Sequence, residues 1–376
     1  MSWFIPENKF DDSKRLVIDT VDIHSNNVCI KGFAKTGKTL LLIYLMRRIR
    51  ISEPNAIIHF IVIRNIEVEK YRNIFRELSL QVNVSTYFKF LRNPQRCDYV
   101  FCDDVQDISV SILSTIANNA NRVIVAMNPY MPIFEKGLLS QEPIITMEEV
   151  IELLSPTVHH LQYFHKGNIH YDLITNLIAD TGLYYSRCIL SKSDCQPRIC
   201  KADSEDSEME YIIKQAKKTS NLGFSTAILL PTNMEVLKFV QRVIKMEGSE
   251  PWNEVSDKWG RIDFSQLNRY LSEKGIPLTC LGTETPECIN VINYYNSTVY
   301  EFDMVFMPFL NNKLFIHLNE TIARNLFVYA ILSSRYSLYM TYSGHMHPYL
   351  TQIETYCGKI DISTPNQNQN NSFIEV

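Results

Sequence analysis

The sequence predicts an α/β protein of two domains, each built around a buried, mainly parallel sheet. Short apolar runs alternate with helical patterns along most of the 376 residues, and this alternation is typical of strands joined by helical crossovers. The run from Ile57 to Ile63 is apolar on both faces, as required of a strand covered by helices on both sides. A chain of this length can bury one core in each of two domains.

The first domain is expected over residues 1–155, as a doubly wound sheet. Its strands are predicted where β-branched and other apolar residues form short runs, and the segments between them have apolar residues at helical spacing. The runs are NVCI (27–30), AIIHFIVI (56–63), VNVST (82–86), DYVFC (98–102) and RVIVAM (122–127).

The second domain is expected over residues 156–350. Residues 190–224 are polar and predict a loop and one helix, whereas NMEVLKFVQRVIKM and ETIARNLFVYAILSS have helical periodicity. Residues 351–376 are expected to form a C-terminal tail, disordered at its Asn- and Gln-rich end. The predicted strands are VHHLQYF (158–164), STAILLP (225–231), INVINYY (289–295), FDMVFMP (302–308) and SLYMTYS (337–343).

Composition indicates a globular protein, and the absence of a predicted signal peptide or membrane-spanning run leads us to expect a cytoplasmic one. The sequence is 45% hydrophobic and 21% charged, with a net charge of −4, so nucleic-acid binding would require a local basic patch. Nine cysteines are scattered, and the closest group, Cys188, Cys195 and Cys200, lacks the paired short spacing of a zinc site. No signal peptide or membrane-spanning run is predicted, and no membrane association is expected.

A phosphate-binding loop is predicted in the segment CIKGFAKTGKTLLLIYLMRRI (29–49). Gly32, Gly37, Lys38 and Thr39 match G-x-x-x-x-G-K-[ST] between a predicted strand and a predicted helix, which is the context that the motif requires. Backbone N–H groups of such a loop face phosphate, the lysine contacts the β- and γ-phosphates, and the hydroxyl can bind Mg²⁺. The residues expected to bind nucleotide are Gly32, Ala34, Lys35, Thr36, Gly37, Lys38 and Thr39.

An acidic pair follows the predicted strand DYVFC. Asp103 and Asp104 stand at its carboxyl end, where phosphate-loop proteins place the carboxylate that holds Mg²⁺. Thr39 and Asp103 are therefore the predicted metal ligands. The predicted catalytic residues are Lys38, Asp103 and Asp104.

The segment DDVQD also resembles the D-E-x-Q-D motif of UvrD/Rep-type superfamily 1 helicases, and further segments resemble that family in the same order. Asn65 corresponds to the Asn of T-F-T-N, and Thr86 and Phe90 to residues of T-F-H-S-F. The resemblance covers about residues 28 to 343, without the large insertions of the family. The other segments are MNPYMPIF, QYFHKGNI, VYEFDMVFMP and VYAILSSRYSLYM.

This resemblance implies two RecA-like domains that bind ATP and Mg²⁺ in the cleft between them. The family's adenine-stacking aromatic corresponds to Phe164, and the Glu that hydrogen-bonds the ribose corresponds to Glu301. Phe164, His165 and Glu301 are therefore expected to reach the nucleotide from the second domain. The base and sugar side of the site looks retained.

The γ-phosphate side departs from the family pattern. Asp104 stands where the family has a Glu that acts on the attacking water, and Met131 replaces a Gln that senses the γ-phosphate. His165 and Ser333 replace two arginines, with Arg335 two positions after the second. An arginine at such a site contributes a factor of about 10³–10⁵ to the rate, so the sequence predicts retained binding and slow hydrolysis.

Three functions stay open on these observations. The first is a helicase-like protein in which Mg-ATP binding and slow hydrolysis drive a conformational change, in a complex with nucleic acid (single-stranded DNA or RNA) and a protein partner. The second is an active ATPase or helicase stimulated by single strands, and the third is a non-catalytic subunit that binds its partner in an ATP-dependent manner. A small-molecule kinase is disfavoured by the ordered resemblance in the second half.

Overall fold

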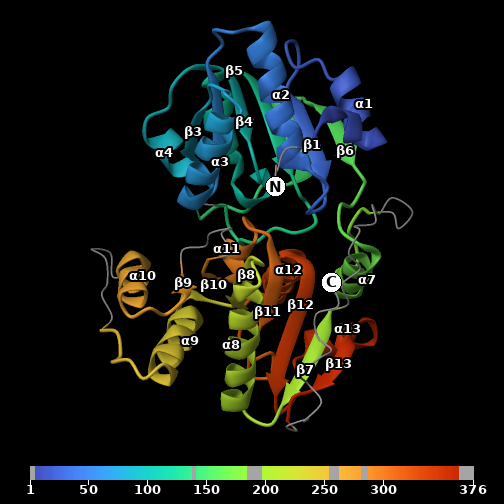
Figure 1. Ribbon diagram of the computed structural model, residues 1–376. Helices are drawn as coiled ribbons and strands as arrows, with labels where there is room; N and C mark the ends of the chain where they lie inside the picture. Colours follow the sequence, from blue (N-terminus) through green and yellow to red (C-terminus); the bar gives the residue numbers. More distant parts are fainter. Residues whose placement is uncertain (1–4, 138–140, 184–196, 254–261, 281–286, 364–376) are drawn as a thin grey trace. The chain divides into compact units, whose positions relative to one another are not determined.

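The computed structural model describes residues 5–137, 141–183, 197–253, 262–280 and 287–363, which form two compact units (Figure 1). The first unit comprises Met1–Lys166 and Asp180–Leu190, and the second comprises Gly167–Ala179 and Ser191–Val376. Each unit contains one sheet, and every strand pair within these two sheets is parallel. The predicted α/β class, with two mainly parallel sheets flanked by helices, is confirmed.

In the first sheet, the strand that leads into the phosphate loop is second from one edge. Across the sheet the order is β3 (Asn83–Thr86), β2 (Ile58–Val62), β4 (Cys97–Cys102), β5 (Ala120–Met127), β1 (Val28–Gly32) and β6 (Thr157–Leu161). Strand β5 separates β1, which leads into the phosphate loop, from β4, which leads into the acidic pair. The helices are α1 (Asp12–Thr20), α2 (Lys38–Ser52), α3 (Asn65–Glu77), α4 (Tyr87–Arg92), α5 (Val110–Ala117) and α6 (Met147–Leu154), with two 3₁₀ turns, η1 (Glu7–Lys9) and η2 (Val105–Asp107).

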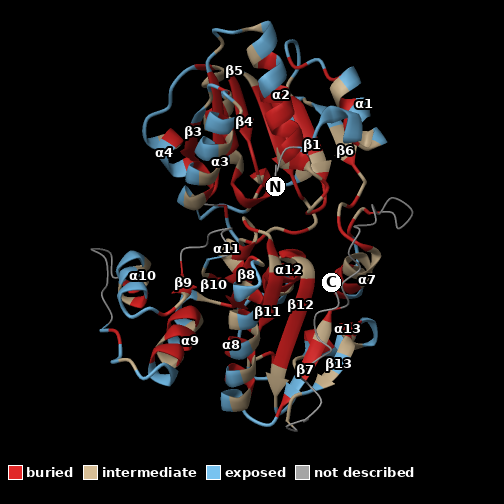
Figure 2. Cartoon of the chain, in the orientation of Figure 1, coloured by how far each residue is buried: buried red, intermediate tan, exposed pale blue. Residues whose placement is uncertain are grey.

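Helices cover both faces of this sheet and bury its inner strands over most of their length, whereas the edge strand β6 is buried only at Leu161 (Figure 2). Successive side chains of a strand point to opposite faces, and β1 shows this: Val28 and Ile30 pack with α1, α2 and α3, whereas Cys29 packs with α4, α5 and α6. Two apolar cores therefore hold β1 from either side. This fixes the position at which the phosphate loop leaves the sheet.

Strand β6 corrects the predicted domain boundary. The run 158–164 was expected to begin the second domain, but β6 pairs in parallel with β1, Val28 opposite Thr157 and Gly32 opposite Leu161. The first unit therefore continues to Lys166. An apolar run predicts a strand without indicating which sheet it joins, because pairing is a long-range choice.

The second sheet has seven strands. Their order is β13 (Gly358–Asp361), β7 (Arg198–Ala202), β12 (Ser334–Ser343), β11 (Phe302–Met307), β8 (Thr226–Leu230), β10 (Ile289–Asn293) and β9 (Leu278–Thr279). One core cluster joins α8, α9 and α10 to the strands. The helices are α7 (Asn168–Leu177), α8 (Glu205–Asn221), α9 (Asn233–Met246), α10 (Phe264–Glu273), α11 (Tyr294–Ser297), α12 (Glu320–Leu332) and α13 (Pro348–Ile353), followed by the 3₁₀ turn η4 (Glu354–Tyr356).

The end of the described chain belongs to the second sheet. Strand β13 pairs with β7, so this unit extends past residue 350, where the sequence analysis ended the domain. The predicted disordered end, 364–376, lies outside the described residues, as do Cys188 and Cys195. Within the described residues, no group of three or more His, Cys, Asp or Glu could hold a metal ion. No described helix is both long and apolar enough to cross a membrane.

Candidate nucleotide site

The phosphate loop connects β1 to α2, and two of its glycines are required by close contacts. Gly37, the N-cap of α2, has φ 90°, and a Cβ there would lie 2.5 Å from Cε of Lys14. A Cβ on Gly32 would lie 2.7 Å from Oγ1 of Thr36 and 3.0 Å from the carbonyl oxygen of Leu161. At Gly32 a side chain would press against backbone as well as Thr36, and at Gly37 the positive φ and the end of the buried Lys14 side chain both favour glycine.

Lys38 begins α2 and turns its side chain back over the loop. Its ammonium donates a 2.9 Å hydrogen bond to the carbonyl oxygen of Phe33, which also accepts from Thr36 Oγ1 at 2.8 Å. The residue is only 8% exposed. Burial lowers the pKa of Lys38, whereas the carboxylates of Asp104 and Asp103 raise it. A further anion beside this buried amine, such as a phosphate, would therefore stabilise its charged form.

Thr39 and Asp103 meet across the sheet edge. Oγ1 of Thr39 donates a 2.6 Å hydrogen bond to Oδ2 of Asp103. Burial, with the neighbouring carboxylate of Asp104, raises the pKa of Asp103 to about 8, against the opposing effects of Thr39 and Lys38. A hydroxyl and a carboxylate are oxygen ligands of the kind that Mg²⁺ binds, and a cation there would favour the ionised carboxylate. The residues present fit a Mg²⁺ site.

The rest of the DDVQD segment is tied to the chain after β5. Asp104 has φ 54°, and the amide of Gln106 donates to Asp104 Oδ1 and Asp107 Oδ2, each at 3.1 Å. Oδ1 of Asp107 accepts from the backbone N–H groups of Ile133, at 2.8 Å, and Phe134, at 3.2 Å. The acidic segment and the MNPYMPIF segment are thus held as one structure.

Met131 lies in this held segment, where the resemblance placed the γ-phosphate sensor. Its side chain is fully buried in the first unit. A buried thioether packs as a core side chain and offers at most a weak hydrogen-bond acceptor. The side chain of Met131 is therefore a core side chain of the first unit.

The structure adds a half-buried cation, Arg64, that the sequence analysis did not single out. Arg64 is the N-cap of α3; its backbone N–H donates to Glu67 Oε2 at 2.7 Å, and its Nε lies 3.4 Å from the same oxygen. Burial lowers the pKa of Arg64, but the charges of Glu67, Asp104 and Asp107 raise it overall. The sequence feature that could have indicated this pair is Arg64 followed three positions later by Glu67 at the end of a predicted strand, which is the spacing of a capping box.

Phe164 and His165 lie in the first unit, which corrects their predicted placement in the second domain. Phe164 is fully buried, with its ring centroid 6.5 Å from that of Phe33 in an edge-on arrangement. The backbone N–H of His165 donates to the carbonyl oxygen of Lys35 at 3.0 Å, and its Nε2 lies 3.0 Å from Asp11 Oδ2. Both residues therefore adjoin the phosphate loop because β6 pairs with β1.

In the second unit, Glu301 and Arg335 come together. Nε of Arg335 lies 3.5 Å from Glu301 Oε2, and its Nη1 lies 3.6 Å from Asp303 Oδ1. Ser333 is fully buried and donates its hydroxyl to the carbonyl oxygen of Ala330 at 2.7 Å. Ser333 stands where the resemblance expects an arginine, and Arg335 follows two positions later. Of these two residues, Arg335 has the more accessible side chain.

The aromatic residues of STYFKF divide between core and surface. Tyr87 and Phe90 are buried, and the Tyr87 hydroxyl donates to the carbonyl oxygen of Asp103 at 3.0 Å. Phe88 is 50% exposed, with the guanidinium of Arg92 lying 5.4 Å from its ring centroid. Only Phe88 of these three presents a ring on which a base could stack.

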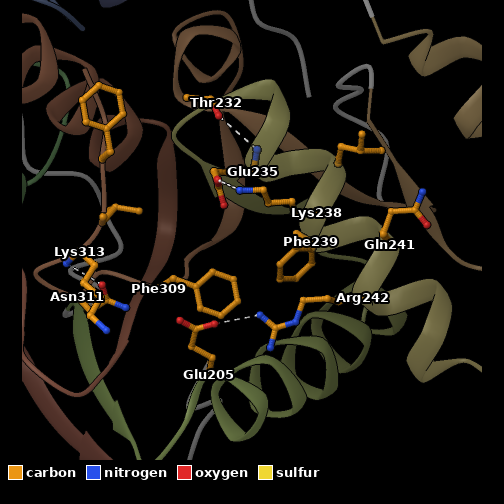
Figure 3. Close-up of a pocket in the computed structure, with 13 residues that line it drawn as sticks. Glu205, Thr232, Glu235, Lys238, Phe239, Gln241, Arg242, Phe309, Asn311 and Lys313 are labelled. Carbon is orange, nitrogen blue, oxygen red and sulfur yellow. Dashed lines mark hydrogen bonds and ion pairs between the residues drawn. The ribbon is translucent and has the colours of Figure 1, made fainter. Parts of the chain in front are cut away.

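A separate pocket of about 730 Å³ lies in the second unit, at the carboxyl ends of β8 and β11 (Figure 3). Arg242 lies over the ring of Phe309, 5.4 Å from its centroid, and pairs with Glu205 at 3.3 Å. Lys238 pairs with Glu235 at 2.8 Å. The described residues that line this pocket include none of the predicted site residues.

No family model and no curated protein matches this sequence. Among the solved structures that match, the helicase nonstructural protein 10 of an arterivirus has a TM-score of 0.43 and 11% identity, over 84% of this chain and 59% of its own. The DUF1998 helicase MrfA, solved bound to DNA, has a TM-score of 0.48 and 8% identity, over 95% of this chain and 52% of its own. This chain thus spans between half and two thirds of the length of these two helicases.

Proposed function

We propose that this chain is a helicase-like protein that binds Mg-ATP through the phosphate loop and hydrolyses it slowly. The observation that carries the proposal is the 2.6 Å hydrogen bond between Thr39 and Asp103 beside the buried Lys38. Together they combine the loop, the cation and the two oxygen ligands of a phosphate-loop site. The sequence resemblance adds the expectation that the nucleotide is ATP.

Each group has a distinct part in this proposal. The amides at the start of α2 and the Lys38 ammonium bind the phosphates, and Lys38 exchanges its bond to the Phe33 carbonyl for one to phosphate. Thr39 and Asp103 hold the metal, and Mg²⁺, when bound, neutralises charge on the phosphate oxygens. Asp104 lies next to Asp103 and orients the attacking water, as its family position implies.

Slow hydrolysis follows from the groups that face the end of the polyphosphate in the proposal. Met131 and Ser333 are buried and bonded or packed within their own units, so neither brings charge to the transition state. His165 and Arg335 are left as candidates, and both are already paired with carboxylates. The resemblance alone brings Glu301 and Arg335 into the proposed nucleotide site.

Nucleotide binding is proposed to cause a conformational change that nucleic acid and a protein partner recognise. This part rests on the resemblance, with the exposed ring of Phe88 as the feature of the first unit that suits a stacked base. An active, single-strand-stimulated ATPase is the second candidate. A partner that supplies an arginine to the site would convert the first into the second.

One preparation tests both candidates. Mg-ATP binding is measured by calorimetry, and turnover is measured without nucleic acid and with single-stranded DNA or RNA. We expect Lys38→Ala to lose Mg-ATP binding. Lys89→Ala, which changes an exposed lysine of the same unit, should keep it. Wild-type turnover should stay well below about 1 s⁻¹, under the usual enzyme range, and the wild type should not unwind duplex. Unchanged binding in Lys38→Ala would refute the site; turnover at tens per second with single strands would support the active helicase.

A further inference from the structure

Lys14, on α1, lies against the phosphate loop. Its side chain is 2% exposed, and its Nζ lies 3.2 Å from the point that a Cβ on Gly37 would occupy. Gly37 directly precedes Lys38 and caps the helix whose first N–H groups face phosphate in the proposed site. A second ammonium thus stands beside the loop, supplied by a segment outside the G-x-x-x-x-G-K-[ST] motif.

Asp11 pairs with this ammonium, and Nε2 of His165 lies beside both groups. Lys14 forms an ion pair with Asp11, which also caps α1 by accepting from the Lys14 backbone N–H at 3.1 Å. Burial alone would raise the pKa of Asp11, but hydrogen bonds from His165, Lys14 and Ser13 bring it below its usual range. Burial lowers the pKa of Lys14, and Asp11 opposes that effect. The carboxylate of Asp11 therefore favours the charged form of the amine, while burial still leaves the pKa of Lys14 below its usual value.

The ammonium has more donors than this cluster can use. A lysine offers three N–H donors, and the described residues provide two partners for them, Asp11 Oδ2 and His165 Nε2. His165 Nε2 also lies 3.0 Å from Asp11 Oδ2, and one ring nitrogen cannot donate to Asp11 and accept from Lys14 together. At least one donor of Lys14 is left for an acceptor at the loop.

A structural ion pair alone accounts poorly for this arrangement. A buried pair stabilises a fold weakly, because desolvation offsets most of the attraction. Here the lysine also occupies the space that a side chain at position 37 would need, so its placement depends on the loop's glycine. His165 reaches the same loop through its backbone N–H, which donates to the carbonyl oxygen of Lys35. The cluster is built onto the loop from two separate segments.

We propose that Lys14 is a second phosphate-binding cation of the site, which contacts the polyphosphate of a nucleoside di- or triphosphate from the Gly37 side of the loop. This inference rests on the proposed function. Asp11 and His165 position the amine in the absence of nucleotide, and phosphate oxygens replace part of this pairing on binding. Lys14 thereby supplies positive charge to a site in which two family arginines are replaced.

The test compares ATP and ADP affinities by calorimetry in the full chain. Lys14→Met removes the charge but keeps a side chain of similar length. It should weaken the binding of both ATP and ADP about tenfold or more, the loss expected for one charge-assisted hydrogen bond. Lys89→Met removes the same charge at an exposed position of the same unit and should leave affinity unchanged. Asp11→Asn keeps the helix cap but removes the competing carboxylate, so it should bind ATP at least as tightly as wild type.

Two outcomes overturn this role. Wild-type affinity in Lys14→Met, with binding lost in Lys38→Ala, would leave the proposed function standing and refute Lys14 alone. A loss in Asp11→Asn equal to that in Lys14→Met would show that the ion pair serves the fold. Unchanged binding in Lys38→Ala as well would refute the site as a whole. If Lys14→Met does not fold, as judged by circular dichroism, Lys14→Gln and Lys14→Arg replace it, with loss expected in the first and retention within about threefold in the second.

Discussion

The Thr39 hydroxyl donates to Asp103 at 2.6 Å although 64 residues of chain separate the two. They meet because β1 and β4 are parallel strands of one sheet, so that the loop after β1 and the acidic pair after β4 emerge at the same edge. In open α/β sheets the carboxyl edge is where ligands bind. The pair is therefore the structural link between the two sequence motifs of the proposed site.

Removing a metal ligand should make nucleotide binding insensitive to metal. In wild type we expect EDTA to weaken ATP binding at least about tenfold, because the metal bridges protein oxygens and phosphate. Asp103→Asn should bind ATP weakly with or without Mg²⁺, and Thr39→Ser, which keeps the hydroxyl, should behave as wild type. Calorimetric titrations with and without EDTA measure this. A full Mg²⁺ response in Asp103→Asn would place the metal elsewhere.

A side chain at Gly37 should weaken ATP binding through a steric clash. A second glycine of similar backbone conformation, Gly223, serves to separate this clash from backbone strain. Gly37→Ala adds a Cβ 2.5 Å from Cε of Lys14, whereas Gly223 has a similar φ of 85° with nothing within 4 Å of an added Cβ. Both alanines carry the backbone strain of positive φ, of order 1 kcal/mol. Only Gly37→Ala should also lose ATP affinity. Equal affinity in the two variants would contradict the tight loop.

Arginine at position 165 should raise turnover more than affinity. His165→Arg can keep the contact with Asp11 while presenting a permanent charge near the loop, and charge that acts on the transition state raises kcat. Ser333→Arg is the contrast, because Ser333 is fully buried and an unpaired buried charge should unfold the second unit. Single-turnover kinetics and thermal unfolding separate the two effects. An His165→Arg variant with wild-type kcat would rule out a role near the γ-phosphate.

The second unit should contribute to nucleotide binding through Glu301 and Arg335. We expect Glu301→Ala and Arg335→Ala each to weaken ATP binding by about 1–3 kcal/mol, the range for a hydrogen bond to a charged group. Glu235→Ala breaks a surface ion pair with Lys238 in the same unit and serves as the control, with no change expected. If both site variants keep wild-type affinity, the resemblance of the second half does not extend to nucleotide binding.

His59 should make the first unit sensitive to acid. It is buried in β2 and bonded to Ser85 at 2.8 Å, and burial, aided by the charge of Lys89, lowers its pKa to about 4. The unfolded chain takes up this proton near pH 6.5, so the histidine's contribution is fully present above that pH and is lost as pH falls towards 4. The span corresponds to about 3 kcal/mol.

His59→Gln should remove this component while keeping a polar partner for Ser85. The raised pKa values of Asp103, about 8, and Asp107, about 7, act in the opposite direction, since those groups favour the folded state at low pH. The comparison is therefore the difference in free energy of unfolding between wild type and variant, from chemical denaturation at pH 7 and pH 4.5. A difference that does not change with pH would refute the assignment.

Local patterns in the sequence were sufficient to predict the α/β class and to propose the centre of the candidate site. Runs apolar on both faces predicted parallel sheets, because such strands are stable only when covered on both sides. The glycine spacing and the residue after β4 predicted the phosphate loop and Asp103, because both motifs express requirements met within a few residues. The family resemblance gave Phe164 and His165 as residues of interest but assigned them to the second domain, whereas they lie in the first unit.

The sequence alone thus predicted two α/β units, most of their strands and a loop suited to phosphate, but it missed β7, β9 and β13. Strand β7 lies within residues 190–224, which were expected to form a loop and one helix. Tertiary structure decided that β6 joins the first sheet, which brings His165 to Lys35. It also decided that Lys14 packs against Gly37. The physical reason is range: helical period, strand alternation and turn chemistry act over a few residues, whereas strand pairing and the placement of buried charges depend on burial shared among segments far apart in the chain.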